Sequence, residues 1–389
     1  MTLSSQGLVS FLLYFIFLTT IHIIDSFVQY LVLIGVTFIF TGMVCFRSTW
    51  PKLQFVDIFA LIPLLTWLYG VSVGVLNSNN VVGIVRNFAG LLFYLAYFFM
   101  VFSRISQRRL ITVIINASIV YLLLASMFGL NSYITRDIIQ FSENGTSSLR
   151  LYYSPGLLVL IPALFIYMSR SSPLLKVDSE RLSLVKKNVF IIIAMFLSLF
   201  VSGSKAIYLS LLALVAIFIF MSILYGIAKL RVRLFALMGL FSGLLFMFYV
   251  RVEISSAIDV LISLETDATH PRVIQAKELI DDFTVFGKGL GAVVPGYSRD
   301  VLGYGFELSF HNIIHKFGII SVFMFASFLA PIFYSVQKII YKSSSLYSYL
   351  PLVFMLYLLP AWGNPTIFAP VSVILHCVAL YLIRLNNPK

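Results

Sequence analysis

Long apolar stretches separated by short polar connections run along the whole chain. Most of these stretches are about 17–25 residues long, the length that an α-helix needs to cross the hydrocarbon of a bilayer. The pattern therefore predicts an all-α polytopic membrane protein, with residues 1–389 forming a single integral membrane domain. The roughly twelve predicted transmembrane helices cover residues 8–24, 27–46, 54–75, 83–102, 110–130, 153–169, 188–203, 206–226, 234–250, 310–335, 346–361 and 366–384.

Composition agrees with this pattern. Hydrophobic residues make up 60% of the chain, charged residues make up 11%, and the mean hydropathy is +1.00. Soluble globular domains carry a charged share of about a quarter. The composition therefore excludes a soluble globular protein.

Lysine and arginine are distributed unevenly between alternate connections. With the N-terminus placed in the cytoplasm, the connections on that side carry most of the 27 Lys and Arg residues and few of the 15 acids. This bias predicts that both termini are cytoplasmic. The net charge of +12 is then a topology signal and does not indicate a nucleic-acid partner.

Two connections on the predicted outer side are long, at about residues 131–152 and 251–309. The second is expected to form a large outer loop with structure of its own. A helix is predicted to begin at Pro271, and it could lie along the membrane surface or cover a cavity between spans. Its apolar stripe at i, i+3, i+4 and i+7 consists of Ala276, Leu279, Ile280 and Phe283.

The segment TVFGKGLGA (residues 284–292, the glycine loop) follows that helix and has the G-x-G-x-x-A spacing of dinucleotide-binding folds. No helix is expected in the VVPGYSRD that comes next, and Lys288 precedes Gly289 where a Walker loop has Ser or Thr. The predicted outward position also argues against a nucleotide, since ATP and NAD are scarce outside the cell. We therefore expect a tight outer turn.

Charged residues near the outer ends of the predicted spans are the candidate functional residues, because such groups are costly within a membrane. The cations suggest a bound anion, and a lipid-linked phosphate fits best. Taken singly, each cation could also snorkel to lipid headgroups. The candidates are Arg86, Arg136, Arg150, Lys205, Arg272, Glu307, His311 and Asn312.

His315 lies one turn after His311, but no third metal ligand accompanies this pair. We therefore predict no metal site.

Four stretches resemble the bacterial O-antigen polymerase and O-antigen ligase superfamily of inner-membrane glycosyltransferases. HPRVIQAKELIDDFTVFGKGLGA resembles the outer-loop pattern of this family, in which an Arg begins a helix that leads to F-G-x-G-x-G. ELSFHNIIHKFGIIS resembles the H-N…G-[IL] segment that follows. SGSKAIYLSLLAL and LRLYYSPGLLVLIP resemble the starts of two other spans. The four motifs cover about 60 residues.

The resemblance implies a metal-independent glycosyltransferase with a GT-C-like fold, no cofactor and an active site on the periplasmic face of the bacterial inner membrane. Its substrates would be oligosaccharide repeat units carried on undecaprenyl pyrophosphate, which a polymerase joins for lipopolysaccharide biosynthesis. An acceptor hydroxyl would attack the anomeric carbon of the donor, and undecaprenyl pyrophosphate would leave. Membrane lipids and a separate chain-length regulator in the membrane are the other expected partners.

The same resemblance assigns roles to the candidate residues. Arg272 and Lys205 would stabilise the leaving pyrophosphate, and His311 or Glu307 would accept the proton of the attacking hydroxyl. The remaining residues of the predicted binding set are Arg86, Arg150, Arg136 and Asn312.

Two departures from the family pattern leave alternatives open. Lys stands at position 205 where the family more often has Arg, which weakens the case for bidentate phosphate binding there. Alignment on Gly318 places Glu307 where the histidine of the family falls, so Glu307 and His311 compete for one role.

Two other functions are also considered. A ligase would transfer the finished glycan to lipid A core, but the gap between Asn312 and Gly318 is shorter than ligases usually have. A flippase or other transporter would suit the number of spans. Transporters often show repeated halves and broken helices near the midplane, and the sequence contains no visible repeat.

Overall fold

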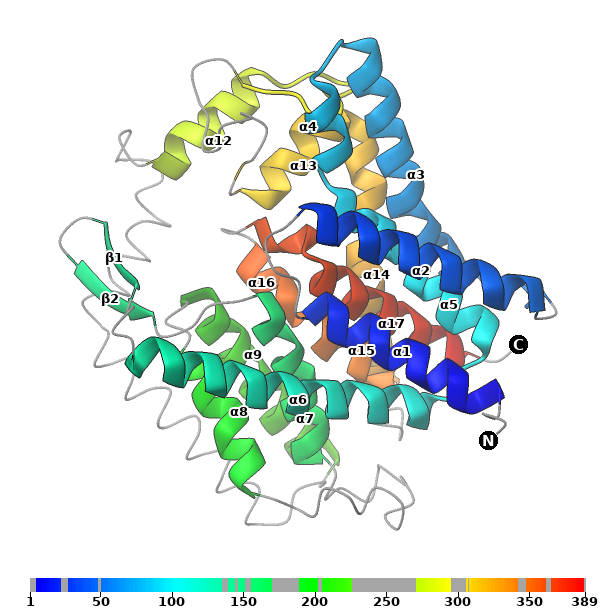
Figure 1. Cartoon of the computed structure of the whole chain (residues 1–389), viewed down its shortest axis with the longest axis vertical. Coiled ribbons are helices and arrows are strands. Elements are labelled where there is room, and N and C mark those ends of the chain that lie inside the picture. Colours follow the sequence, from blue (N-terminus) through cyan, green and yellow to red (C-terminus); the bar gives the residue numbers. More distant parts are fainter. Residues whose placement is uncertain are drawn as a thin grey trace.

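The computed structural model describes residues 5–21, 27–47, 50–134, 139–143, 146–150, 155–169, 189–201, 205–225, 271–294, 306, 308–341, 348–361 and 365–387. Within them the chain is predominantly helical (Figure 1). Eleven of the twelve predicted apolar runs coincide with helices, and the run at 234–250 lies outside the described residues.

Six of these runs form unbroken helices. They are α1 (Ser5–Ile21), α2 (Phe27–Arg47), α3 (Phe55–Leu76), α6 (Gln107–Ile134), α8 (Val189–Val201) and α9 (Lys205–Tyr225).

The other five runs are interrupted by turns of 3-10 helix. The run at 83–102 consists of α4 (Val81–Arg86), η1 (Ala89–Tyr94) and α5 (Leu95–Ser103), and the run at 153–169 consists of η2 (Pro155–Val159) and α7 (Leu160–Ser169). The run at 310–335 consists of α13 (Ser309–Phe317), η4 (Gly318–Ile320) and α14 (Ser321–Ile340). The last two runs consist of α15 (Leu350–Phe354), η6 (Met355–Tyr357) and α16 (Leu358–Ala361), and of η7 (Pro365–Phe368) and α17 (Pro370–Asn386).

Four helical stretches are long and apolar enough to cross a membrane, and several other apolar helices are shorter. A membrane protein is therefore supported, while twelve crossings and their direction remain predictions. The four stretches are Phe55–Leu76, Val81–Ser103, Gln107–Leu124 and Ser309–Ile340.

A short β-hairpin accompanies the helices and leaves the all-α class unchanged. Strands β1 (Ile139–Glu143) and β2 (Thr146–Arg150) pair antiparallel within the predicted outer connection 131–152. The sequence between them is Asn144-Gly145, the dipeptide that most favours a two-residue hairpin turn. This local signal predicts the hairpin, although the hydrophobic pattern does not.

Helix α17 forms the centre of the core. It packs against α1, α3, α5, α14 and α15, and its residues from Pro370 to Ile383 are all buried (Figure 1). Apolar side chains on α3 and α14 instead face outward, including Leu65 and Phe323. An apolar core and an apolar exterior are the arrangement expected of a bundle in lipid.

His376 links α17 to its neighbours. Its Nδ1 bonds the hydroxyl of Tyr94, and its Nε2 bonds the carbonyl of Ser327 at 3.1 Å. The hydroxyl of Ser327 donates in turn to the carbonyl of Phe59 at 2.6 Å. Because both ring nitrogens have partners, His376 fits the structural role expected of a lone histidine in an apolar run.

A buried ion pair joins the start of α3 to the end of α17. Asp57 is only 2% exposed and accepts hydrogen bonds from the guanidinium of Arg384 and the hydroxyl of Tyr97. The backbone N–H of Gln54 donates to the same carboxylate at 2.7 Å. Arg384 also donates to the carbonyl of Lys52 at 2.7 Å. The carboxylate thus closes the first turn of α3 and fixes α17 beside it.

We predict that Arg384→Ala lowers the stability of the protein by about 3–5 kcal/mol, because it leaves Asp57 charged and buried without its cation. Thermal unfolding of the purified protein in detergent measures this loss. Lys52→Ala is the matched control, since it removes an exposed cation at the same place and keeps the carbonyl that Arg384 contacts. Equal melting temperatures for the two variants would contradict the prediction.

Candidate functional site

The glycine loop docks between the last turns of α3 and the end of α13. The N–H groups of Lys288 and Gly289 donate to the carbonyls of His315 and Lys316, each at 2.9 Å. The N–H of Leu290 donates to the carbonyl of Gly70 at 2.9 Å. The last carbonyls of a helix have no partner within the helix. The loop therefore caps α13 and ties it to α3.

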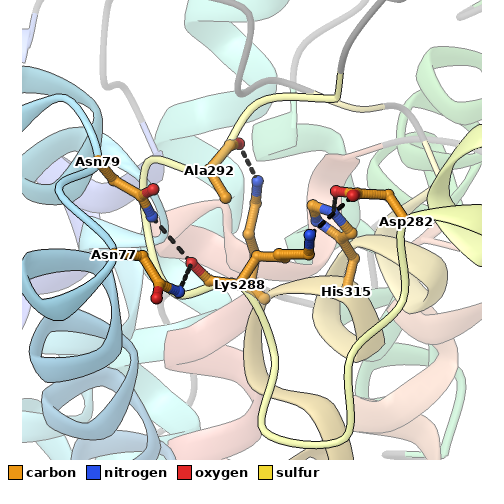
Figure 2. Close-up of polar contacts among 7 residues, drawn as sticks. Asn77, Asn79, Asp282, Lys288, Ala292 and His315 are labelled. Atoms are coloured by element: carbon orange, nitrogen blue, oxygen red, sulfur yellow. Dashed lines mark hydrogen bonds and ion pairs between the residues drawn. The ribbon is translucent and has the colours of Figure 1, made fainter.

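Two asparagines after α3 hold the loop from the other side (Figure 2). Asn77 and Asn79 donate their side-chain N–H groups to the carbonyl of Lys288, at 3.1 and 2.9 Å. Asn79 also bonds the carbonyl of Leu290 at 2.9 Å. Side chains that satisfy loop carbonyls in this way fix one loop conformation.

The amides from Gly287 to Gly291 all donate to groups of the protein. Besides the three amides already described, the N–H of Gly287 donates to the carbonyl of Thr284 at 2.9 Å, and that of Gly291 to Oδ1 of Asn87 at 3.4 Å. A phosphate-cradling loop must point several N–H groups at its ligand. The five consecutive amides from Gly287 to Gly291 leave none for that purpose, so the glycine spacing has another cause.

That cause is close backbone packing. Gly289 has φ +78°, and a Cβ there would lie under 3.0 Å from the backbone of Gly74. Gly318, at the end of α13, has φ +55°, and a Cβ there would lie under 3.0 Å from the carbonyl of Val285. Only glycine adopts such angles readily and lets two backbones approach so closely.

A cluster of charged groups forms where α12 (Pro271–Asp281), the glycine loop and α13 meet (Figures 1 and 2). The carboxylate of Asp282 accepts from Nζ of Lys288 and from Nε2 of His315, each at 2.8 Å. Asp282 and Lys288 are partly exposed, whereas the side chain of His315 is 0% exposed. Burial acts to raise the pKa of Asp282, but the hydrogen bonds from His315 and Lys288 outweigh it and lower the pKa.

The contact with Asp282 fixes how His315 carries its proton. Because the carboxylate accepts, Nε2 of His315 bears the hydrogen, and Nδ1 of the neutral ring is left as an acceptor. Nδ1 is buried and has no hydrogen-bond partner among the described residues. The sequence prediction missed this pairing because it considered His315 only as a metal ligand. An acid 33 residues away gives no local signal.

The buried face of α13 carries two more polar side chains. Lys316 is 0% exposed, donates from Nζ to the carbonyl of Ala292, and lies 5.0 Å from the ring centroid of Phe306. Asn312 is 3% exposed, and its Oδ1 has no hydrogen-bond partner among the described residues. A buried acceptor without a partner is unusual and marks a place where a polar ligand group or water would be favoured.

The structure brings together the elements that carry some of the predicted site residues. His311 lies half-buried on α13 beside the buried Asn312. Exposed Arg86 ends α4, next to Asn87, which contacts the loop. Arg272 lies in the first turn of α12, which packs against α13.

The remaining predicted site residues lie on other elements or outside the described part of the chain. Lys205 begins α9, which packs against α7, α8 and α16, and Arg150 ends strand β2. The side chains of Arg272, Lys205 and Arg150 lie outside the described part of the chain, as do Arg136 and Glu307 altogether. The competition between His311 and Glu307 for the role of base therefore stays open.

No family model matches the chain, and a search of curated proteins finds no match. The resemblance to the O-antigen polymerase and ligase superfamily thus rests on the motifs alone.

We predict that Gly289→Ala destabilises the protein by at least about 1–2 kcal/mol, because alanine resists a positive φ and its Cβ would meet the backbone of Gly74. Gly35→Ala, within α2, is the matched control, since nothing lies within 4 Å of a Cβ there. Alanine at Gly35 should be neutral or stabilising, because it is the better helix former. Thermal unfolding in detergent compares the two, and equal shifts would refute the packing explanation.

Asp282→Asn should lower the melting temperature at neutral pH but have little effect in acid. The pKa of Asp282 is lower in the folded protein, so its contribution to stability is complete above its ordinary value, about 4, and is lost as the pH falls through the lowered value. Melting curves of both proteins from neutral pH to about pH 3 test this. A difference between the two proteins that does not change with pH would count against it.

Proposed function

We propose that this protein is a glycosyltransferase that uses sugars linked to a polyprenyl pyrophosphate, of the O-antigen polymerase type. One observation carries the proposal. The most specific stretch of the resemblance, the helix and loop from Arg272 to Gly291, packs as one unit with the segment around His311. Backbone bonds from Lys288 and Gly289 and the Asp282–His315 contact join them.

The chemistry of the unit suits such a transfer. The bond between the sugar and the pyrophosphate is already activated, so the protein needs to stabilise the negative charge of the leaving group and accept one proton. Arg272 and Arg86 lie on elements that meet the glycine loop, and they are the proposed partners of the pyrophosphate. His311, half-buried on α13, is the described candidate for the base, and Glu307 remains its alternative.

The ligase is the closest alternative within the same proposal. Both reactions would use the same donor and the same leaving group, and they differ only in the acceptor. The short distance in sequence between Asn312 and Gly318 favours the polymerase.

A transporter is the second candidate function, and one observation favours it. Two of the four candidate membrane spans are broken: Val81–Ser103 at Phe88, which has φ +57°, and Ser309–Ile340 at Gly318. The breaks lie close together, since the rings of Phe88 and Phe317 are 5.6 Å apart. Many secondary transporters bind their substrate at helix breaks of this kind.

We predict that the purified protein, mixed in detergent with an undecaprenyl-pyrophosphate-linked repeat unit and EDTA, forms a ladder of lengthening glycans on a gel. Arg272→Ala should slow the reaction by about 10²–10³-fold, and His311→Ala by about 10²–10⁴-fold if His311 is the base. Lys277→Ala, on the exposed side of α12, is the matched control and should retain the rate of the unchanged protein.

The other outcomes separate the alternatives. Transfer only after lipid A core is added would identify a ligase. Failure of both reactions by a folded protein that moves the lipid-linked unit across vesicles would identify a transporter and overturn the proposal.

A further inference from the structure

The glycine loop begins beside the last two turns of α3, and its later residues also reach Asn77 and Asn79, just after that helix. The hydroxyl of Tyr69 donates to the carbonyl of Phe286 at 2.7 Å, and the N–H of Leu290 bonds the carbonyl of Gly70. Tyr69 precedes the end of α3 at Leu76 by seven residues, which corresponds to about 10 Å along the helix axis. The 22 residues of α3 are only slightly longer than the hydrocarbon of a bilayer is thick. If α3 spans the bilayer over its whole length, the start of the loop lies at the depth of the last two turns of that span.

Many backbone groups of the loop meet the requirement that hydrocarbon imposes. An unpaired backbone group costs several kcal/mol there, so a non-helical segment must find its partners within the protein. The amides from Gly287 to Gly291 all donate to protein groups, as described above. The carbonyl of Val285 accepts from the N–H of Ile319 at 2.8 Å, and that of Phe286 accepts from Tyr69. A turn surrounded by water would not need this degree of internal pairing.

The exposed edge of the loop is apolar and continues a larger apolar surface. Val285 is 57% exposed, Phe286 is 72% exposed, and Ile319, which bonds the loop, is 58% exposed. Phe286 is held against the part of α3 that exposes Leu68, and Ile319 leads into α14, which exposes Phe323. These outward faces belong to two of the candidate membrane spans.

The charged groups near this edge neutralise each other. Lys288 and Asp282 form an ion pair at 2.8 Å, so the loop brings no unpaired charge of its own to that level. A long lysine side chain can also extend its ammonium group away from an apolar region.

We propose that residues 284–290 form a re-entrant element of the membrane domain, and that Val285, Phe286 and Ile319 contact the acyl chains of the bilayer. The partner of this surface is lipid hydrocarbon. This inference replaces the outer turn expected from the sequence, and it does not depend on the proposed chemistry.

Spin labelling tests the proposal in the full-length protein. A nitroxide is attached to Phe286→Cys in a background in which Cys45 and Cys377 are replaced, and the protein is placed in vesicles of phosphatidylcholine and phosphatidylglycerol. Collision with oxygen, which concentrates in lipid, is compared with collision with a water-soluble nickel chelate. Phe323→Cys on α14 is the reference for lipid contact, and Lys277→Cys on α12 is the reference for water.

The proposal expects the oxygen-to-nickel ratio at Phe286 to match that at Phe323 and to exceed that at Lys277 several-fold. A ratio equal to that at Lys277 would place the loop in water and overturn the proposal. Shielding from both reagents would mean that protein, such as a second copy of the chain, covers this edge, and would overturn it too. Val285→Cys supplies the same measurement if the variant at Phe286 does not fold.

Discussion

Backbone groups freed where helices break inside apolar segments must find partners, and the rest of the described structure depends on this constraint. An unpaired N–H or C=O group costs several kcal/mol in hydrocarbon. The last turn of α13 would leave the carbonyls of Ile314, His315 and Lys316 without partners. The N–H of Gly318 takes the first, and Lys288 and Gly289 of the glycine loop take the other two. The conformation of the loop is thus dictated by the end of α13.

The charged cluster is a consequence of the same docking. Once Lys288 and Gly289 pair with the end of α13, Asp282, just before the loop, lies beside His315, and Nζ of Lys288 reaches the same carboxylate. The packing that satisfies the helix end therefore also fixes the tautomer of His315. Structural and chemical roles are not separable here, because the bonds that hold the loop also hold the candidate site.

The hydrophobic pattern predicts most of the helices but little of their packing. Eleven apolar runs are helices, and α12 begins at Pro271 as expected. The predicted apolar stripe of α12 is divided, however, since Leu279 is buried whereas Ile280 is 61% exposed. In a membrane protein an apolar side chain can face either the protein core or the lipid, so an apolar stripe does not show which way a helix faces.

The glycines illustrate the second limit of sequence reasoning. Their spacing is visible in the sequence, but the backbones that require them belong to other elements. Gly287 approaches Lys316 on α13, Gly289 approaches Gly74 on α3, and Gly291 approaches Ile84 on α4. The spacing therefore matched a nucleotide fingerprint, although its physical cause is the close approach of the loop to other backbones. The Asn144-Gly145 hairpin is the opposite case, because its signal is entirely local.

The way the breaks are closed bears on the choice between transferase and transporter. A transporter that uses a broken helix leaves the freed backbone groups of the half-helices available to its substrate. Here the loop amides occupy the freed carbonyls of α13, and aromatic rings pack where the breaks meet, with Phe88 and Phe368 only 4.0 Å apart. The partly exposed charges lie outside the broken helices, with Asp282 directly after α12 and Lys288 on the glycine loop. Because the freed backbone groups at the break after α13 are already paired within the protein, the break offers few of the groups that a transporter would present to a solute, and this counts against passage through it.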